Sequence, residues 1–268
     1  MPEGDTVWLV AERLNTRLRG SILGETDFRV PALATVDLAG SRVTQVRSYG
    51  KHLLIATEGA TTGAQTLHSH LKMEGAWHLY PPGARWRGGP SHQIRAVLRT
   101  ADTVAVGYRL AGLEIAPTSQ ARQRFLAHLG PDILDPEFDP DVAWRRVAAE
   151  TDRGIAEVLL DQRVLAGLGM NYVAEVCFLS GVHPKATVDT VDSQAIVSLA
   201  SRMILANRGR AARTTTGSSR RGSSSWIHGR RTCLRCDTRL EFDVIGAPAA
   251  SRRIPWCPTC QRDFRDRE

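Results

Sequence analysis

The first residues of the chain combine two groups that could do chemistry together. Pro2 follows the initiator methionine and Glu3 follows Pro2. A small second residue permits removal of Met1, so Pro2 is expected to become a terminal secondary amine, which can attack an electrophilic carbon and form an iminium ion. The carboxylate of Glu3 could then move protons. A frayed terminus is the common alternative for such a segment, but two distant features favour the chemical interpretation.

The first feature is a pair of Cys-x2-Cys motifs near the C-terminus. Cys233 and Cys236 form the first motif, and Cys257 and Cys260 form the second. The motifs are about twenty residues apart, at the upper end of the spacing typical of a four-cysteine zinc ribbon. Each motif can offer two thiolates from one tight turn, and a hairpin between them would complete the tetrahedron that zinc prefers. The sequence therefore predicts one zinc ion bound by these four residues.

The segment between the motifs favours a hairpin over two disulfides. Leu240, Phe242 and Val244 alternate with polar residues before Gly246 breaks the run, as expected for a β-strand that ends in a turn. Two disulfides would need an oxidising compartment, and no apolar segment typical of a signal peptide follows the N-terminus. The remaining cysteine, Cys177, lies in an apolar stretch and is interpreted as a small buried hydrophobic residue.

The second feature is the distribution of charge. The formal net charge is +7 and the sequence pI is about 9.6. The segment from Arg208 to Arg239 is rich in arginine and contains one acidic residue, Asp237, while Arg252 and Arg253 precede the second cysteine motif. A polyanionic partner, and nucleic-acid phosphate in particular, is the natural match for this segment. A solvated basic face is the alternative.

Two kinds of pattern divide the chain, whose 268 residues are compatible with two domains. Val7, Val10, Leu14 and Leu18 have helical spacing, with Gly20 as a stop. Short β-like runs follow and favour a β-sandwich or barrel; they cover residues 42–48, 52–57, 76–80, 94–99 and 103–108. No apolar run reaches membrane-spanning length.

After about Pro117 the spacing becomes helical, in residues 122–129, 142–150 and 155–162. Gly167 and Gly169 then permit a tight turn, and the next helix would present free N–H groups to a phosphate. A plain turn between helices is the alternative for two glycines in this arrangement. Residues 214–225 are rich in Thr, Ser, Gly and Arg, and are expected to form a flexible loop.

Taken together, these motifs resemble the formamidopyrimidine-DNA glycosylase and endonuclease VIII family. The matching segments are Pro2-Glu3-Gly4, Leu159-Leu160-Asp161-Gln162, Ala166-Gly167-Leu168-Gly169 and the paired cysteines. Met1 to Thr6 and Tyr49 to Leu54 look closest to the actinobacterial endonuclease VIII-like branch.

The resemblance implies an α+β fold in which damaged DNA binds between the parts. An N-terminal β-sandwich with an N-terminal helix is expected at 1–117, and a linker at 118–139. A helix-two-turns-helix domain is expected at 140–225, and a four-cysteine zinc-finger hairpin at 226–268.

The resemblance also implies a role for three residues in catalysis. Pro2 matches the nucleophile that attacks C1′ of the damaged nucleoside. Glu3 matches the carboxylate that moves protons during ring opening and base loss. Lys51 matches the lysine that holds phosphate beside the lesion, although a surface charge is the common alternative for a lysine between two strands.

Four further residues are matched to DNA binding. Arg252 corresponds to the hairpin arginine that contacts phosphate, and Asn171 to an asparagine with the same kind of contact. Met73 is the candidate wedge that enters the opened base stack, with an ordinary core residue as the alternative. Arg109 is a weaker candidate for a partner wedge.

Three positions depart from the family pattern. Thr6 stands where many relatives have a second catalytic glutamate, Met170 separates Gly169 from Asn171, and the turn around Met73 differs from relatives' wedge residues. These departures affect substrate range and turnover more than fold.

The expected function is therefore base-excision repair by a bifunctional DNA glycosylase and AP lyase. It would remove oxidised bases, pyrimidines above all, and cleave the strand by β- and δ-elimination, with zinc in a structural role. The protein is expected to be a monomer in the bacterial cytoplasm. Its expected partner is DNA that contains oxidised bases or abasic sites, and no membrane association is expected. The alternatives are a non-catalytic damage-binding protein and a zinc-ribbon transcription regulator.

Overall fold

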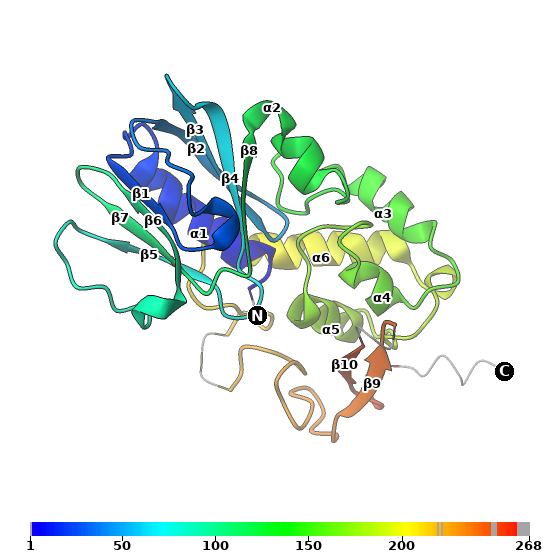
Figure 1. The fold of residues 1–268 in the computed structure, drawn as a ribbon. Helices are drawn as coiled ribbons and strands as arrows, with labels where there is room; N and C mark the ends of the chain where they lie inside the picture. The colour runs from blue at the N-terminus through cyan, green and yellow to red at the C-terminus, as the bar shows by residue number, and fades with distance from the viewer. Residues whose placement is uncertain (1, 219, 221, 248–250, 262–268) are drawn as a thin grey trace. The chain divides into compact units, whose positions relative to one another are not determined.

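The computed structural model describes residues 2–218, 220, 222–247 and 251–261 (Figure 1). Met1, whose removal the expected chemistry requires, lies outside these residues. The chain forms two compact units, Met1–His128 and Leu129–Glu268. In the described ranges no helix combines the length and the apolar character needed to cross a bilayer.

The first unit is a β-sandwich preceded by a helix, as the sequence predicts. Helix α1 spans Gly4–Leu18, and short 3-10 turns lie at Pro31–Leu33 and Ser91–Gln93. One antiparallel sheet has the order β2-β3-β4-β8 and the other the order β1-β6-β7-β5. The strands of the first sheet are β2 (Arg42–Tyr49), β3 (His52–Gly59), β4 (Gly63–His70) and β8 (Gly112–Pro117). Those of the second are β1 (Glu25–Phe28), β5 (Ala76–Tyr80), β6 (Ile94–Arg99) and β7 (Val104–Tyr108).

One apolar core joins α1 to both sheets. Val7, Leu14 and Leu18 of α1 belong to the same buried cluster as Leu53 of β3 and Leu98 of β6. The helix packs on β2 and β3. Since the apolar stripe of α1 is fully used in this core, the residues that precede the helix are attached to a rigid body.

The first unit ends in a short helical segment. Helix α2 (Thr118–Ala121) continues directly into a π-helical turn, Arg122–Leu126. The helical segment therefore begins and ends earlier than the expected 122–129.

The second unit contains four helices in the described residues and a β-hairpin (Figure 1). The helices are α3 (Pro140–Ala148), α4 (Ile155–Leu160), α5 (Met170–Leu179) and α6 (Ser193–Asn207), with a 3-10 turn at Val188–Thr190. Helix α5 packs against α4, α6 and strand β10, so it is buried on most of its surface. The hairpin consists of β9 (Glu241–Ile245) and β10 (Arg252–Trp256).

Candidate active site

The N-terminal residues are held in place by α1. Glu3 is the residue before the helix, and its carbonyl oxygen accepts hydrogen bonds from the N–H groups of Thr6 and Val7, both at 3.0 Å. The Glu3 residue is only 1% exposed, and Pro2 is half-buried. A buried carboxylate next to an anchored proline is not a frayed terminus, so this segment is suited to chemistry that needs fixed geometry.

Asp5 is a second buried acid in the first turn of α1. Its Oδ1 accepts the backbone N–H of Thr6 at 2.8 Å. The partial positive charge at a helix N-terminus stabilises an acid here. The two acids, Glu3 and Asp5, thus lie within three residues of Pro2.

Lys51 lies in a two-residue hairpin turn between β2 and β3. Tyr49 pairs with His52 across the turn, and Gly50 between them has φ 55°. Leu53 is buried directly after His52. Because a two-residue turn has little conformational freedom, the backbone of Lys51 is fixed.

A cluster of histidines that the sequence analysis missed adjoins this turn. The rings of His68, His70 and His128 all lie near the ring of His52, and Nδ1 of His52 is 2.8 Å from Nε2 of His68. Burial, followed by repulsion from the neighbouring histidines, lowers the pKa of His52 to about 3. Burial also lowers the pKa of His70 to about 4. At neutral pH these two rings are therefore uncharged beside Lys51.

Met73 is on the surface. It lies in the turn between β4 and β5, and 67% of it is exposed. The alternative of an ordinary core residue is therefore wrong. Arg109 lies beside this turn, and its Nε donates a hydrogen bond to the carbonyl oxygen of Glu74 at 3.1 Å.

In the second unit, Gln162 holds the turn that leads into α5. Its Nε2 donates to the carbonyl oxygens of Leu160 and Leu168, both at 3.0 Å, and its Oε1 accepts the N–H of Gly167 at 3.0 Å. Gly167 has φ +108°, and a Cβ there would lie 3.0 Å from Cγ2 of Ile133. Glycine is required here by both the backbone and the packing.

Asn171 is the second residue of α5, directly after this turn. The helix begins at Met170, and Gly169 before it is extended, with φ −133°. The N-terminus of a helix presents free N–H groups and a partial positive charge. Asn171 therefore lies where an anion is favoured, although Met170 displaces it by one residue from the family pattern.

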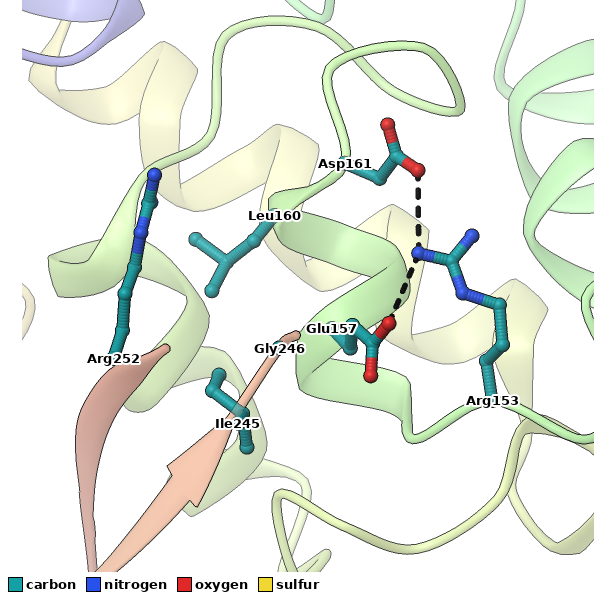
Figure 2. Close-up of a pocket in the computed structure, with 7 residues that line it drawn as sticks. All are labelled: Arg153, Glu157, Leu160, Asp161, Ile245, Gly246 and Arg252. Carbon is teal, nitrogen blue, oxygen red and sulfur yellow. Dashed lines mark hydrogen bonds and ion pairs between the residues drawn. The ribbon is translucent and has the colours of Figure 1, made fainter. Parts of the chain in front are cut away.

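Arg252 lies at the start of β10 and lines a cavity of about 160 Å³ (Figure 2). The side chains of Arg252 and Arg153 lie on opposite sides of this cavity, with Leu160 and Ile245 between them. Arg153 forms ion pairs with Glu157 at 3.4 Å and Asp161 at 3.2 Å.

Asp161 is the acid of the Leu-Leu-Asp-Gln motif. Hydrogen bonds from Arg163 first, and from Arg153 in addition, lower the pKa of Asp161 to about 2. Its carboxylate is therefore ionised at all physiological pH values, and it neutralises the two arginines nearest to it. Among the described residues, Arg252 on the other side of the cavity has no ion pair with Asp161 or Glu157, so its charge is available.

The four cysteines form a compact cluster. One sulfur from each of Cys233, Cys236, Cys257 and Cys260 lies within 4.8 Å of the others. The separations include 3.9 Å for Cys233–Cys260, 3.5 Å for Cys236–Cys257 and 3.5 Å for Cys236–Cys260. Zn–S bonds of about 2.3 Å in a tetrahedron place sulfurs roughly 3.8 Å apart. The cluster is therefore positioned to bind a metal ion. Cys177 is fully buried in α5 and separate from the cluster, as predicted.

A buried carboxylate connects α5 to the segment that precedes the cysteines, and the sequence analysis did not identify it. Glu175 accepts backbone N–H groups from Trp226, Ile227 and His228 at 2.8 to 2.9 Å, and also the hydroxyl of Thr215. The loop expected to be flexible at 214–225 is thus held by hydrogen bonds at Thr215, near its start, and at Trp226, directly after it. A carboxylate with four donors stabilises this connection strongly.

A sandwich that starts with a buried acid beside a proline, and a helical unit that carries a four-cysteine hairpin, define a class of DNA-repair glycosylases and AP lyases. Two family models match the chain: the formamidopyrimidine-DNA glycosylase N-terminal domain over residues 1–129, and the formamidopyrimidine-DNA glycosylase H2TH domain over residues 129–217. The chain belongs to this family, as its motifs predicted.

Curated relatives agree with this assignment over nearly the whole chain. The chain is 48% identical to a probable endonuclease 8 2 of Streptomyces coelicolor, covering 97% of this chain and 94% of that one. It is 45% identical to the DNA-(apurinic or apyrimidinic site) lyase Nei2 of Mycolicibacterium smegmatis, covering 97% and 99%.

Solved structures share the fold. A mutant of Lactococcus lactis Fpg in complex with a Fapy-dG containing DNA aligns with a TM-score of 0.78 at 22% identity, covering 98% of this chain and 100% of that one. The same organism's Fpg bound to DNA with an abasic site gives a TM-score of 0.75 at 24% identity, with the same coverage. At this identity the similarity concerns the fold alone.

Proposed function

We propose that this chain is a bifunctional DNA glycosylase and AP lyase that removes oxidised bases, with oxidised pyrimidines as its preferred substrates. The observation that carries the proposal is the buried Glu3 next to Pro2 at the start of α1. The preference for pyrimidines rests on the resemblance to the endonuclease VIII branch, and actinobacterial relatives of the chain are named endonuclease 8.

Pro2 is the proposed nucleophile. After loss of Met1, its secondary amine attacks C1′ of the damaged nucleoside, and the C1′–N bond to the base breaks. Glu3 donates the proton that opens the sugar ring and takes part in base loss. The resulting iminium acidifies C2′, so loss of a C2′ proton expels the 3′ phosphate by β-elimination, and δ-elimination then releases the 5′ phosphate.

Lys51, Asn171 and Arg252 are the proposed phosphate contacts. Lys51 is fixed by its hairpin turn, and Asn171 lies in the first turn of α5. Arg252 keeps its charge available because Arg153 is the partner of the carboxylates in the adjacent cavity. Such contacts supply affinity that does not depend on sequence.

Met73 is the proposed wedge. The target carbon is hidden in a duplex until the nucleotide is flipped out, and an apolar side chain inserted into the base step replaces the lost stacking. The exposure of Met73 at the tip of its turn is what such insertion needs. Arg109, which the sequence matched to a partner wedge, donates a hydrogen bond to the carbonyl oxygen of Glu74 next to Met73, and this supports a role in holding the turn.

Zinc is the proposed ion in the cysteine cluster, with a structural role. Four thiolates complete its coordination and leave no open position for a substrate. Bound zinc would hold the hairpin that carries Arg252 in its fold.

The proposed location is the bacterial cytoplasm, where the protein would act on chromosomal DNA as a monomer.

Borohydride trapping tests the proposed function directly. The wild-type protein is incubated with oligonucleotides that contain an abasic site or an oxidised pyrimidine, and a covalent protein–DNA adduct is expected on reduction. Mass spectrometry of the same preparation should show that Met1 is absent. Absence of an adduct on both substrates would favour the non-catalytic damage-binding alternative, and excision by protein that retains Met1 would rule out Pro2 as the nucleophile.

A further inference from the structure

The turn that carries Met73 has an exposed tip and buried ends. It joins β4 of one sheet to β5 of the other, and Leu71 and Gly75 at its ends are buried while the three residues between them are exposed. The N–H of Gly75 donates to the carbonyl oxygen of Leu71 at 2.9 Å and closes the turn. Met73 is thus presented by a short, closed loop.

The first half of this turn has an unusual backbone conformation. Lys72 has φ 46°, in the left-handed region that is unfavourable for a residue with a side chain. Its N–H donates to Nδ1 of His70 at 2.9 Å. The imidazole of His70, which is uncharged at neutral pH, is therefore the acceptor that fixes this end of the turn.

The second half of the turn is held by Arg109. This residue follows β7, and its Nε donates to the carbonyl oxygen of Glu74, the residue after Met73. The same guanidinium donates from Nη1 to Oε1 of Gln93, and the backbone N–H of Arg109 donates to the carbonyl oxygen of Gln93 at 2.8 Å. The side chain thus spans from a fixed part of the sandwich to the carbonyl oxygen beside the tip.

At Gly75 the turn is packed closely against the connection that carries Arg109. A Cβ on Gly75 would lie 2.5 Å from the carbonyl oxygen of Leu71 and 3.1 Å from that of Arg109. The backbones of the two connections, residues 71–75 and 109–111, are therefore packed directly against each other. Movement of Arg109 would be transmitted to the turn.

Strain is concentrated at the same place. Among the described residues, three that are not glycine have a positive φ, and two of them are Lys72 and Arg109. Such residues persist only where the surroundings fix them, and they cluster at functional sites. Glycine would relieve the strain at position 109, but it would lack the guanidinium that reaches Glu74.

We propose that Arg109 is a positioning residue, which holds the Leu71–Gly75 turn so that Met73 is presented to the base stack. Arg109 then acts on catalysis through Met73, not through a DNA contact of its own. This inference rests on the proposed role of Met73 as the wedge.

A double-mutant cycle in the full chain tests the inference. Single-turnover excision is measured for Met73→Ala, Arg109→Ala and the double variant on duplex with an oxidised pyrimidine, and cleavage is measured on single-stranded abasic DNA. Each single change should slow duplex excision by about 10-fold or more. The rate of the double variant should lie within about 2-fold of the rate of the slower single variant. All three should cleave single-stranded abasic DNA at close to the wild-type rate.

Two further variants separate positioning from charge. Arg109→Lys keeps the charge but loses the planar group that binds Glu74 and Gln93 together, so it should be as slow on duplex as Arg109→Ala. Arg95→Ala is the matched control, because the Arg95 guanidinium also donates to backbone carbonyl oxygens, those of His92 and Ile94. It should leave duplex excision unchanged.

Additive effects would overturn the inference. If the double variant is slower by the product of the two single effects, about 100-fold where each is about 10-fold, Arg109 contacts DNA independently. Recovery of duplex excision in Arg109→Lys would lead to the same conclusion.

Hydrogen exchange separates this inference from the proposed wedge. The peptide that covers the Leu71–Gly75 turn should exchange faster in Arg109→Ala than in the wild type, and unchanged exchange would show that Arg109 does not hold the turn. If instead Met73→Ala excises from duplex at the wild-type rate, the wedge fails as part of the proposed function, whatever the exchange result.

Discussion

The carboxylate of Glu175 accepts the backbone N–H of Ile227 at 2.9 Å, across 52 residues of sequence. Both residues are fully buried. Glu175 belongs to α5, whose first turn contains Asn171, and Ile227 precedes the cysteine hairpin that carries Arg252. The hydrogen bond therefore joins the two segments of the second unit that are proposed to bind phosphate.

Replacing Glu175 with Gln should destabilise this unit. The side-chain amide can accept at its oxygen, but its NH2 group would face N–H donors and leave at least one buried group unpaired. The free energy of unfolding should fall by about 3 kcal/mol, as expected when one partner of a buried charged network is lost. Urea unfolding of the metal-loaded protein measures the change.

Glu157→Gln is the control for that experiment. Glu157 is half-buried, with a side chain that is 42% exposed, and forms an ion pair with Arg153 at 3.4 Å, so its loss should change the free energy of unfolding by less than about 1 kcal/mol. Equal stabilities of the two variants would contradict the role assigned to Glu175.

Pro2 and Glu3 should affect different steps. Pro2→Gly leaves a primary amine and should reduce the yield of borohydride-trapped adduct. Glu3→Gln should slow excision of an oxidised base by about 100-fold or more, within the range for general acid–base catalysis, and should slow the lyase step on a preformed abasic site much less. Single-turnover assays on the two substrates separate the steps, and equal slowing of both by Glu3→Gln would contradict a role in base loss.

The cysteine cluster should be required for DNA binding but not for the folding of the first unit. Cys257→Ser removes one of four metal ligands, so the purified variant should lose stoichiometric zinc and bind duplex more weakly. The β-sandwich should keep its thermal transition, because its core contains no residue of the hairpin. Metal analysis and calorimetry check both outcomes, and wild-type protein that is active without bound metal would overturn the assignment.

Buried neutral histidines should make stability depend on pH. The folded pKa values of His52 and His70 lie below their ordinary values, so the unfolded chain binds more protons as the pH falls below about 6.5. Stability is therefore full above that pH and is lost as the pH falls toward the folded pKa values, by at most about 1.4 kcal/mol per pH unit for each histidine. Urea unfolding at pH 7 and pH 5 measures the loss.

His52→Gln should reduce that dependence. Besides burial, Lys51 and Lys72 help to lower the pKa of His70, and Glu114 lies 3.9 Å from His68. These three residues are the same in both proteins, so the change in slope reports the loss of the His52 ring. His92→Gln is the control, since His92 is exposed in the 3-10 turn Ser91–Gln93. An unchanged slope in His52→Gln would contradict the lowered pKa.

Local patterns in the sequence predicted the elements but not the contacts between distant segments. The alternation of apolar residues identified five of the strands, and cysteine spacing identified the four residues that lie together in position to bind a metal ion. Strand β4 was missed because its buried residues run consecutively from Thr66 to Ser69, and three of the four are polar. Helix α6 was missed although Ile196, Ala200 and Ile204 have helical spacing.

Other features could not be read from local sequence. Nothing near Glu175 indicates hydrogen-bond partners about fifty residues further on, and the left-handed φ of Arg109 depends on packing between two chain connections. Likewise, the lowered pKa of His52 follows first from burial and then from repulsion by His68 and His70, which strand pairing brings near it.

Arg252 should contribute to binding through charge alone. Arg252→Ala should lower affinity for damaged and undamaged duplex by the same factor and reduce the slope of log K against log salt by about 0.9, the value for one phosphate contact. Arg253→Ala is the control, because it also removes one positive charge from β10. The guanidinium of Arg253 lies over the ring of Phe242, 4.6 Å from its centroid. Because successive residues of a strand point to opposite faces, this control should leave the slope nearly unchanged. Fluorescence anisotropy over a series of salt concentrations measures both slopes. Equal reductions in the two variants would mean that the hairpin attracts DNA by its net charge, without the specific phosphate contact proposed for Arg252.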